Sequence, residues 1–263
     1  MSIKFGSITN PWVDIIEELK LISKLEFDYA EVGIELPEGS PEILLRRKKR
    51  ILKLLDSFKS EPIAHTAWWV DFGSGYDIVR KSWIEEAKNM IDVAKILKAS
   101  KINFHFYSIG LVEDYKPYHK EILENIVKSL REVVKYADSK KMMVMLENSP
   151  TKRSNVGIKE YKYVLDNVPN LRVHFDIAHA FVENGMKGIK DYMFTFKNKI
   201  EHIHIHDNHG DADEHLSLGQ GNINFEQVAK WLKQTDYNKT ITFEVFTSKE
   251  AAKASMMGFR KLI

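Results

Sequence analysis

The sequence contains no cysteine among its 263 residues. Disulfide bonds and thiolate metal ligands are therefore excluded, and any bound metal must be held by histidine, aspartate or glutamate. No apolar run approaches the ~20 residues that cross a bilayer, and the first residues, MSIKFGSITNP, lack the charged-then-apolar pattern of a secretory signal. We therefore expect a cytoplasmic protein without a membrane partner.

The chain also lacks a large excess of either charge. It carries 39 basic and 37 acidic residues, a net charge of +2, which gives no strong electrostatic attraction to nucleic acid. The basic run Arg46–Arg50 lies inside a predicted helix among leucines and isoleucines. This pattern indicates the solvent face of a helix rather than a nucleic-acid patch.

Short apolar segments alternate with amphipathic ones along the whole chain, with no linker and no low-complexity insert. Strands are expected at residues 3–9, 29–35, 62–68, 101–107, 142–149, 171–179, 200–207 and 240–246. Helices are expected at residues 12–25, 42–59, 78–97, 118–139, 158–167, 189–197 and 224–234, and from residue 249 onward.

These eight β-α units predict one α/β domain over residues 1–263, a closed (β/α)8 TIM barrel. A doubly wound open sheet is the alternative. No Gly-x-Gly-x-x-Gly turn follows the first predicted strand, which counts against the dinucleotide-binding form of that fold.

One stretch, EHIHIHDNHGDADEHLSLGQG at residues 201–221, holds half of the ten histidines. His202, His204 and His206 alternate with isoleucines, so a strand here places the histidines on one face. Imidazoles and carboxylates are the usual ligands of zinc and manganese. The stretch therefore predicts a metal site, with a solvated histidine-rich loop as the alternative.

Metal-binding and proton-transferring side chains recur near the ends of six consecutive predicted strands. In a (β/α)8 barrel these ends meet at one mouth, where the chemistry takes place. Each residue alone can be a hydrogen-bonded core residue, but one divalent cation compensates the buried charge of the whole set. We therefore predict a metal site formed from His65, His105, Glu147, Asp176, His179, His204, Asp213, His215 and Glu244.

Other polar and aromatic residues have two interpretations. His174 and His202 lie one pleat deeper than the predicted ligands and belong to the core or support those ligands. Four aromatic residues just past the third predicted strand either pack or form an apolar wall for a substrate: Trp68, Trp69, Phe72 and Tyr76. Lys152 and Arg153 either contact a phosphate or are surface residues.

In their order along the chain, these segments resemble the xylose isomerase-like barrel superfamily. That superfamily contains sugar (phosphate) isomerases and epimerases and also endonuclease IV. The resemblance covers essentially the whole chain. It is carried by AHTAW at His65, NFHFY at His105, LENS at Glu147, FDIAHAF at Asp176 and His179, HIHD at His204, DEHLSLGQGNINF at Asp213 and His215, and FEVF at Glu244.

The isomerase and epimerase branch implies one divalent ion, Mn, Zn or Co. Its ligands would be Glu147, Asp176, His204 and Glu244. Glu147 and Glu244 would serve as acid and base on a sugar or sugar phosphate, through a metal-bound enediolate, with His179 orienting the substrate oxygens. This is the function we expect. A homo-oligomer is compatible with it.

The endonuclease IV branch implies up to three zinc ions on all nine residues of the predicted site, cleaving DNA at abasic sites. Here, however, residues 147–153 read ENSPTKR where the nuclease pattern reads ENTAGQG, and the charge is near neutral. A third alternative is a metal-stabilised binding protein without turnover. The pair Glu147 and Glu244 counts against it.

Overall fold

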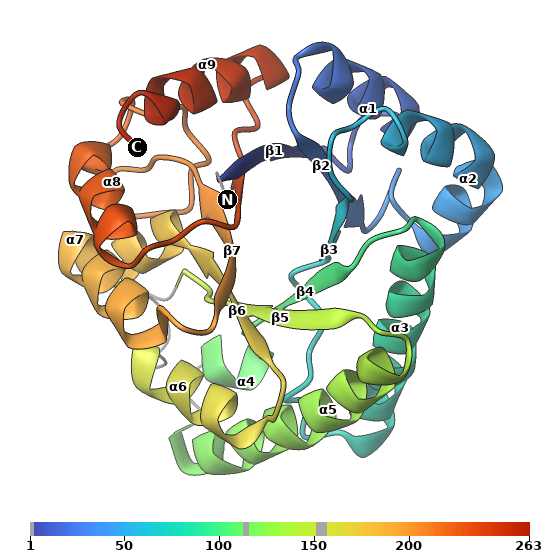
Figure 1. Cartoon of the computed structure of the whole chain (residues 1–263). Helices are drawn as coiled ribbons and strands as arrows, with labels where there is room; N and C mark the ends of the chain where they lie inside the picture. Colours follow the sequence, from blue (N-terminus) through green and yellow to red (C-terminus); the bar gives the residue numbers. More distant parts are fainter. Residues whose placement is uncertain (1–2, 113–115, 151–156) are drawn as a thin grey trace.

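The computed structural model describes residues 3–112, 116–150 and 157–263. Eight parallel strands close into a barrel in chain order, and β8 pairs back with β1 (Figure 1). The predicted (β/α)8 TIM barrel is therefore confirmed. The strands are β1 Lys4–Ile8, β2 Tyr29–Ile34, β3 Ile63–Thr66, β4 Lys101–His105, β5 Met143–Glu147, β6 Arg172–Asp176, β7 Ile200–Ile205 and β8 Thr240–Phe243.

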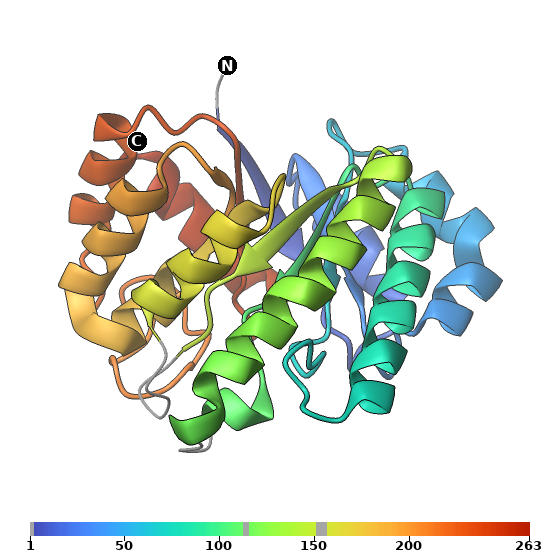
Figure 2. The same ribbon diagram turned by 90° about the horizontal axis from the view of Figure 1, so that it is seen from below.

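Helices form an outer layer around the strands, as the two views in Figures 1 and 2 show. Their apolar residues pack together with those of the strands in one core between the two layers. No described helix is long and apolar enough to cross a membrane. The helices are α1 Ile15–Lys24, α2 Pro41–Leu55, α3 Asp77–Ile96, α4 Ile109–Val112, the 3-10 turn η1 Lys116–Tyr118, α5 His119–Ser139, α6 Ile158–Asn167, α7 Ile177–Phe196, α8 Phe225–Gln234 and α9 Lys249–Arg260.

Helix α7 begins much earlier than the predicted helix at 189–197, and that prediction was wrong at its start. The carboxylate of Asp176 caps the helix by accepting a hydrogen bond from His179 N, so His179 lies in the first helical turn rather than on the strand. The helix is kinked at Asn184 and Gly185, where Gly185 has a φ of +57° that favours glycine. Amphipathic periodicity is interrupted there, which hid the first half of the helix.

Alternation along the strands makes the interior of the barrel polar near its mouth. On β7, Ile203 joins the apolar core, whereas His202 and His204 alternate with it and are also 0% exposed. The β6–β7 register places His174 beside His202 and Asp176 beside His204. The prediction that His174 and His202 lie one pleat deeper is therefore confirmed, and two layers of polar side chains are stacked inside the barrel.

Candidate metal centre

Four of the predicted ligands meet at the centre of the mouth. Glu147 ends β5, Asp176 ends β6, His204 lies on β7 and Glu244 follows β8. One donor atom of each lies within 4.8 Å of the others. His204 Nδ1 is 2.9 Å from a Glu244 oxygen and 3.9 Å from oxygens of Glu147 and Asp176. We call these residues the central group.

The donor chemistry of the central group fits a divalent cation. Three carboxylates are buried together, and like charges at such separations repel strongly away from water. Asp176 Oδ1 accepts from the backbone of His179, but Asp176 Oδ2 is buried without a hydrogen-bond partner in the described part of the chain. A mixed oxygen and nitrogen set of this kind suits Mn, Zn or Co.

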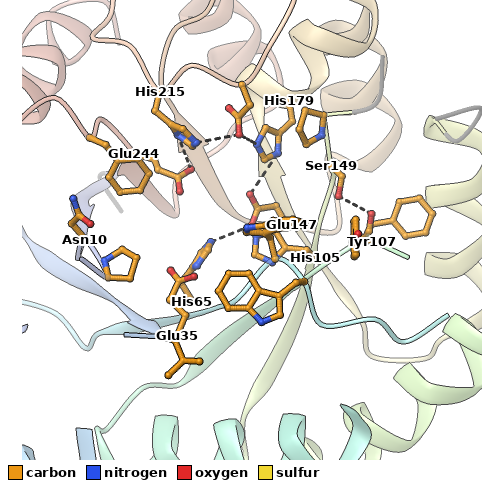
Figure 3. A pocket seen from close by; sticks show the side chains of 18 of the residues that line it. Asn10, Glu35, His65, His105, Tyr107, Glu147, Ser149, His179, His215 and Glu244 are labelled. Carbon is orange, nitrogen blue, oxygen red and sulfur yellow. Dashed lines mark hydrogen bonds and ion pairs between the residues drawn. The ribbon is translucent and has the colours of Figure 1, made fainter. Parts of the chain in front are cut away.

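A second group of donors lies on one side of Glu147. Glu147 Oε2 accepts from Asn103 Nδ2 at 2.5 Å and lies 3.2 Å from His105 Nε2 and 3.5 Å from His65 Nε2. Neither ring nitrogen of the buried His65 has a hydrogen-bond partner among the described residues. His65 and His105 therefore lie beside the central group, close to Glu147, as Figure 3 shows.

A third group lies around Asp213, in the loop after β7. Asp213 Oδ2 is 3.1 Å from His179 Nε2 and 3.1 Å from His215 Nε2. His206 Nε2 lies 3.4 Å from both Asp213 Oδ1 and Asp176 Oδ2, and His206 is 0% exposed. All nine predicted residues thus gather at one mouth of the barrel in three adjacent groups. Their role as metal ligands stays a prediction.

The loop that carries Asp213 and His215 is organised by the carboxylate of Asp207. This carboxylate accepts from the backbone nitrogens of Asn208, Gly219, Gly221 and Ile223 at 2.8–3.2 Å. A Cβ added at Gly221 would lie 2.3 Å from Asn208 O, so only glycine fits there. The Gly-x-Gly of the sequence is thus explained by close packing on Asp207 as well as by the turn.

Replacing Asp207 with alanine is expected to lower the free energy of unfolding by about 3 kcal/mol, because several buried backbone donors lose a charged acceptor. Metal binding at Asp213 and His215 should weaken with it. Chemical denaturation followed by circular dichroism measures the loss. The control is Glu226→Ala, which removes an exposed carboxylate. Equal stability of the two variants would contradict the role of Asp207.

The electrostatics of the site keep Glu244 ionised. Burial disfavours ionisation of this carboxyl, but His204 and His215 beside it hold its pKa at about 2. Burial lowers the pKa of His215, but the carboxylates of Glu244 and Asp213 outweigh it and raise that pKa to about 9. Glu35, which lines the cavity above the site, has its pKa raised by burial.

A cavity of about 640 Å³ opens above the three groups. Its floor includes Glu147, His179 and Glu244, and its described lining contains no lysine or arginine. Lys152 and Arg153 lie outside the described residues. Aromatic and apolar side chains form the walls, including Trp12, Leu36, Trp68, Trp69, Tyr107 and Phe246. Of the two interpretations of the four aromatic residues, the structure favours the wall for Trp68 and Trp69 and packing for Phe72, which is buried in the core. Tyr76 is exposed and does not line the cavity.

Several residues of the site were not assigned from the sequence. They are Glu31, Glu35, Asn103 and Asn148, together with His206, which the predicted strand at 200–207 included but the nine predicted ligands did not. All but Asn148 lie two or four positions from another residue that faces the barrel interior, on a strand or just past its end. This even spacing predicts the same face of the strand and was the signal that could have identified them. Asn148 joins β5 to β6 by donating to Asp176 O and accepting from Asp176 N, a contact between distant segments that no local pattern reveals.

The fold and the site define a closed (β/α)8 barrel whose histidines and carboxylates converge at the C-terminal mouth, where they could hold a metal ion. The sequence model of the xylose isomerase-like TIM barrel matches residues 19–262. The chain belongs to this family, as its motifs predicted.

Three similar proteins illustrate the range of the family. An uncharacterised protein of Methanocaldococcus jannaschii is 29% identical over 261 residues, covering 97% of this chain and 87% of its own. A probable endonuclease 4 of Aquifex aeolicus is 24% identical and covers 77% of this chain and 76% of its own. The solved structure of a D-tagatose 3-epimerase-like protein is 26% identical, with a TM-score of 0.83 over 98% of this chain and 99% of its own. The chain is thus related to enzymes of the sugar isomerase and epimerase group.

Proposed function

We propose that the protein is a metal-dependent isomerase or epimerase of a sugar. The observation that carries this proposal is the placement of Glu147 and Glu244. Glu147 ends β5 and Glu244 follows β8, with two strands between them, and both reach the floor of one small cavity with their carboxylates in the same donor group. Two carboxylates that approach one substrate carbon from different sides can remove a proton on one face and return it on the other.

The central group would hold the ion, which when bound supplies a Lewis acid that stabilises negative charge on the substrate oxygens. Glu147 and Glu244 exchange the proton on the carbon next to the carbonyl. His179 lines the cavity, and its Nδ1 lies 2.7 Å from Asn148 O, which fixes the ring so that Nε2 points toward Asp213. His179 is thereby held in place to orient a substrate hydroxyl.

The lining of the cavity supports a neutral sugar as the substrate. A volume of about 640 Å³ lies within the range of small-molecule sites. Aromatic walls can pack against the carbon skeleton of a sugar. In one wall the rings of Trp68 and Tyr107 lie edge to face, with their centroids 5.3 Å apart. A sugar phosphate is usually bound by lysine or arginine, and neither lines the described part of the cavity. A phosphate would therefore depend on Lys152 and Arg153.

A second candidate function is hydrolysis of a phosphodiester. It is favoured by the two groups beside the central one, His65 and His105 on one side and His179, Asp213 and His215 on the other. This arrangement suits more than one ion, and a pair or triplet of ions stabilises both oxygens of an in-line displacement. The described lining nevertheless carries no lysine or arginine for a phosphate backbone.

The decisive experiment combines metal analysis with hydrogen exchange. Protein purified without chelators is incubated in D2O with a panel of ketoses and their phosphates, and deuterium at the carbon next to the carbonyl is followed by NMR. We expect exchange with one sugar and about one ion per chain in the central group. Two or three zinc ions, cleavage of abasic duplex DNA and no exchange with any sugar would establish the second candidate instead.

Replacing Trp68 with alanine is expected to raise KM about tenfold with little change in kcat, because an aromatic wall binds substrate and transition state alike. Trp68 is 55% exposed, so its loss should leave the fold intact. The matched control is Tyr76→Ala. Tyr76 is an exposed aromatic residue outside the cavity lining. An equal rise in KM for both variants would contradict the role of Trp68.

A further inference from the structure

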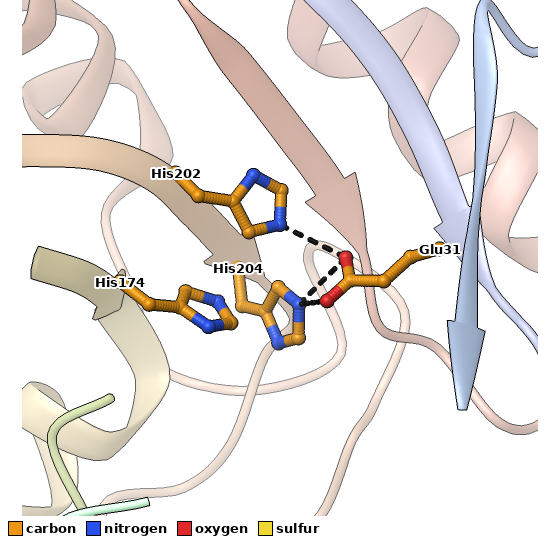
Figure 4. Close-up of side chains that lie close together, drawn as sticks. All are labelled: Glu31, His174, His202 and His204. Carbon is orange, nitrogen blue, oxygen red and sulfur yellow. Dashed lines mark hydrogen bonds and ion pairs between the residues drawn. The ribbon is translucent and has the colours of Figure 1, made fainter. Parts of the chain in front are cut away.

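A carboxylate with no role in the predicted site lies in the interior of the barrel, beneath the central group. Glu31 projects from β2, is 0% exposed, and faces three histidines of β6 and β7 (Figure 4). Both of its oxygens lie 3.0 Å from His204 Nε2, and Oε2 also lies 2.9 Å from His202 Nε2. The carboxylate therefore joins the deeper polar layer to one of the predicted metal ligands.

The two ring nitrogens of His204 face opposite partners. Nε2 faces Glu31, whereas Nδ1 faces the oxygens of Glu244, Glu147 and Asp176. Each ring nitrogen thus faces a carboxylate, and an ionised carboxylate only accepts hydrogen bonds. If an ion takes Nδ1, the one proton left on the ring is on Nε2, where Glu31 accepts it. The lone pair then lies on Nδ1 and points into the central group. A metal-binding histidine needs this arrangement.

We propose that Glu31 is a positioning residue of the metal centre. It holds His204 in the tautomer that leaves Nδ1 free for the ion, and its negative charge strengthens that nitrogen as a donor. The inference rests on the metal centre of the proposed function, but on no particular sugar or reaction. Glu31 touches neither the ion nor the substrate and acts only through His204.

The neighbours of Glu31 hold it in the required place. His202 gives it a second donor, and His202 Nδ1 is itself fixed 2.8 Å from Thr240 Oγ1 on the paired strand β8. A buried carboxylate is costly unless its charge is compensated. No lysine or arginine contacts Glu31 among the described residues. The rings of His202 and His204 are the groups that compensate its charge, and they fix the carboxylate between them.

The deeper layer has one rival use. Donors of Glu31, His174, His202 and His204 lie within 4.8 Å of one another, and both ring nitrogens of His174 lack a hydrogen-bond partner. An ion held there would have to displace the hydrogen bonds that His202 and His204 already make to Glu31. The positioning role keeps those bonds, and we therefore favour it. The rival predicts a different ion count and is tested directly.

The test is the affinity for Co²⁺ or Mn²⁺, measured by competition with a chelator, in the wild type and in Glu31→Gln. We expect the variant to bind about 10- to 100-fold more weakly, with an unchanged number of ions at saturation and a shifted visible spectrum of the Co²⁺ form. Tyr29→Phe is the matched control. Tyr29 lies on the same strand as Glu31, and its replacement removes a buried hydrogen bond to Thr242 without touching His204. The metal affinity of this variant should equal that of the wild type.

Each outcome bears on the proposal. Affinity in Glu31→Gln within about twofold of the wild type, against the 10- to 100-fold expected, would overturn it. If the wild type binds two ions and Glu31→Gln loses one of them while the second keeps its affinity, the lost ion lies inside the deeper layer and the proposal is overturned. If Glu31→Gln does not fold, His202→Gln, which removes the second donor of Glu31, should still weaken binding several-fold, and unchanged affinity there would overturn the proposal. Weakened affinity without turnover of any sugar would refute the proposed function and leave the role of Glu31 intact.

Discussion

Replacing Glu147 or Glu244 with glutamine is expected to lower kcat by about 10²- to 10⁴-fold at saturating metal. A glutamine side chain can still offer an oxygen to an ion, but it cannot accept or return a proton. Glu244 begins the cycle ionised and able to accept a proton, since His204 and His215 hold its pKa at about 2 against burial, although so low a pKa makes it a weak base. Steady-state kinetics on the sugar found by the exchange screen measure the loss.

The two variants should also differ from each other. If each carboxylate serves one face of the substrate carbon, each variant keeps solvent exchange of the proton for one epimer and loses it for the other. Glu35→Gln is the control, because Glu35 lines the same cavity but belongs to none of the three donor groups. It should retain exchange with both epimers. Full turnover in both Glu147→Gln and Glu244→Gln would refute the proposed mechanism.

The barrel could be predicted because its strands are short, apolar and evenly spaced. Each strand end delivers its polar residue to the same mouth, so the order of His65, Glu147 and Glu244 along the chain was enough to group them. The two-residue repeat of a strand also predicted that His202 lies one pleat deeper in the barrel than His204. These inferences required only local patterns and the rule that parallel strands of a barrel point the same way.

What the sequence could not supply depends on register and on side-chain direction. Glu31 lies in YAEVGIE, and its meeting with His204 follows from how β2 closes on β8 through β1, which no local pattern encodes. The start of α7 depends on the carboxylate of Asp176, which also belongs to the central group. His206 lies just beyond β7, although the predicted strand ran to residue 207, and the pattern did not show that its ring turns toward Asp176 and Asp213. At these places the contacts of the functional residues, rather than the local sequence pattern, determine the structure.

Removal of the ion by EDTA is expected to abolish turnover and to lower the unfolding temperature. An ion present at a thousand times its Kd stabilises the fold by about 4 kcal/mol, which for a chain of this size corresponds to a shift of roughly 10 °C. The physical reason is the set of buried carboxylates, Glu147, Asp176 and Glu244, which repel one another without a cation. Thermal unfolding with and without EDTA measures the shift.

The size of that shift should depend on pH, because His215 partly replaces the cation in the metal-free protein. The pKa of His215 is raised from 6.5 to about 9 despite burial, chiefly by Glu244. A raised pKa contributes stability fully below pH 6.5 and loses it as the pH rises toward about 9. The depressed pKa of Glu244 contributes stability above pH 4.5, which is lost as the pH falls toward about 2.

The metal-free protein is therefore weakened on the alkaline side, where histidine ligands are most free to bind an ion. The gap in unfolding temperature between the loaded and metal-free forms should widen from pH 6.5 to pH 9. His215→Gln removes the titrating ring and should flatten this widening while the central group remains complete. A gap that stays constant with pH in the wild type would show that His215 does not compensate Glu244, and equal unfolding temperatures at every pH would refute the metal centre itself.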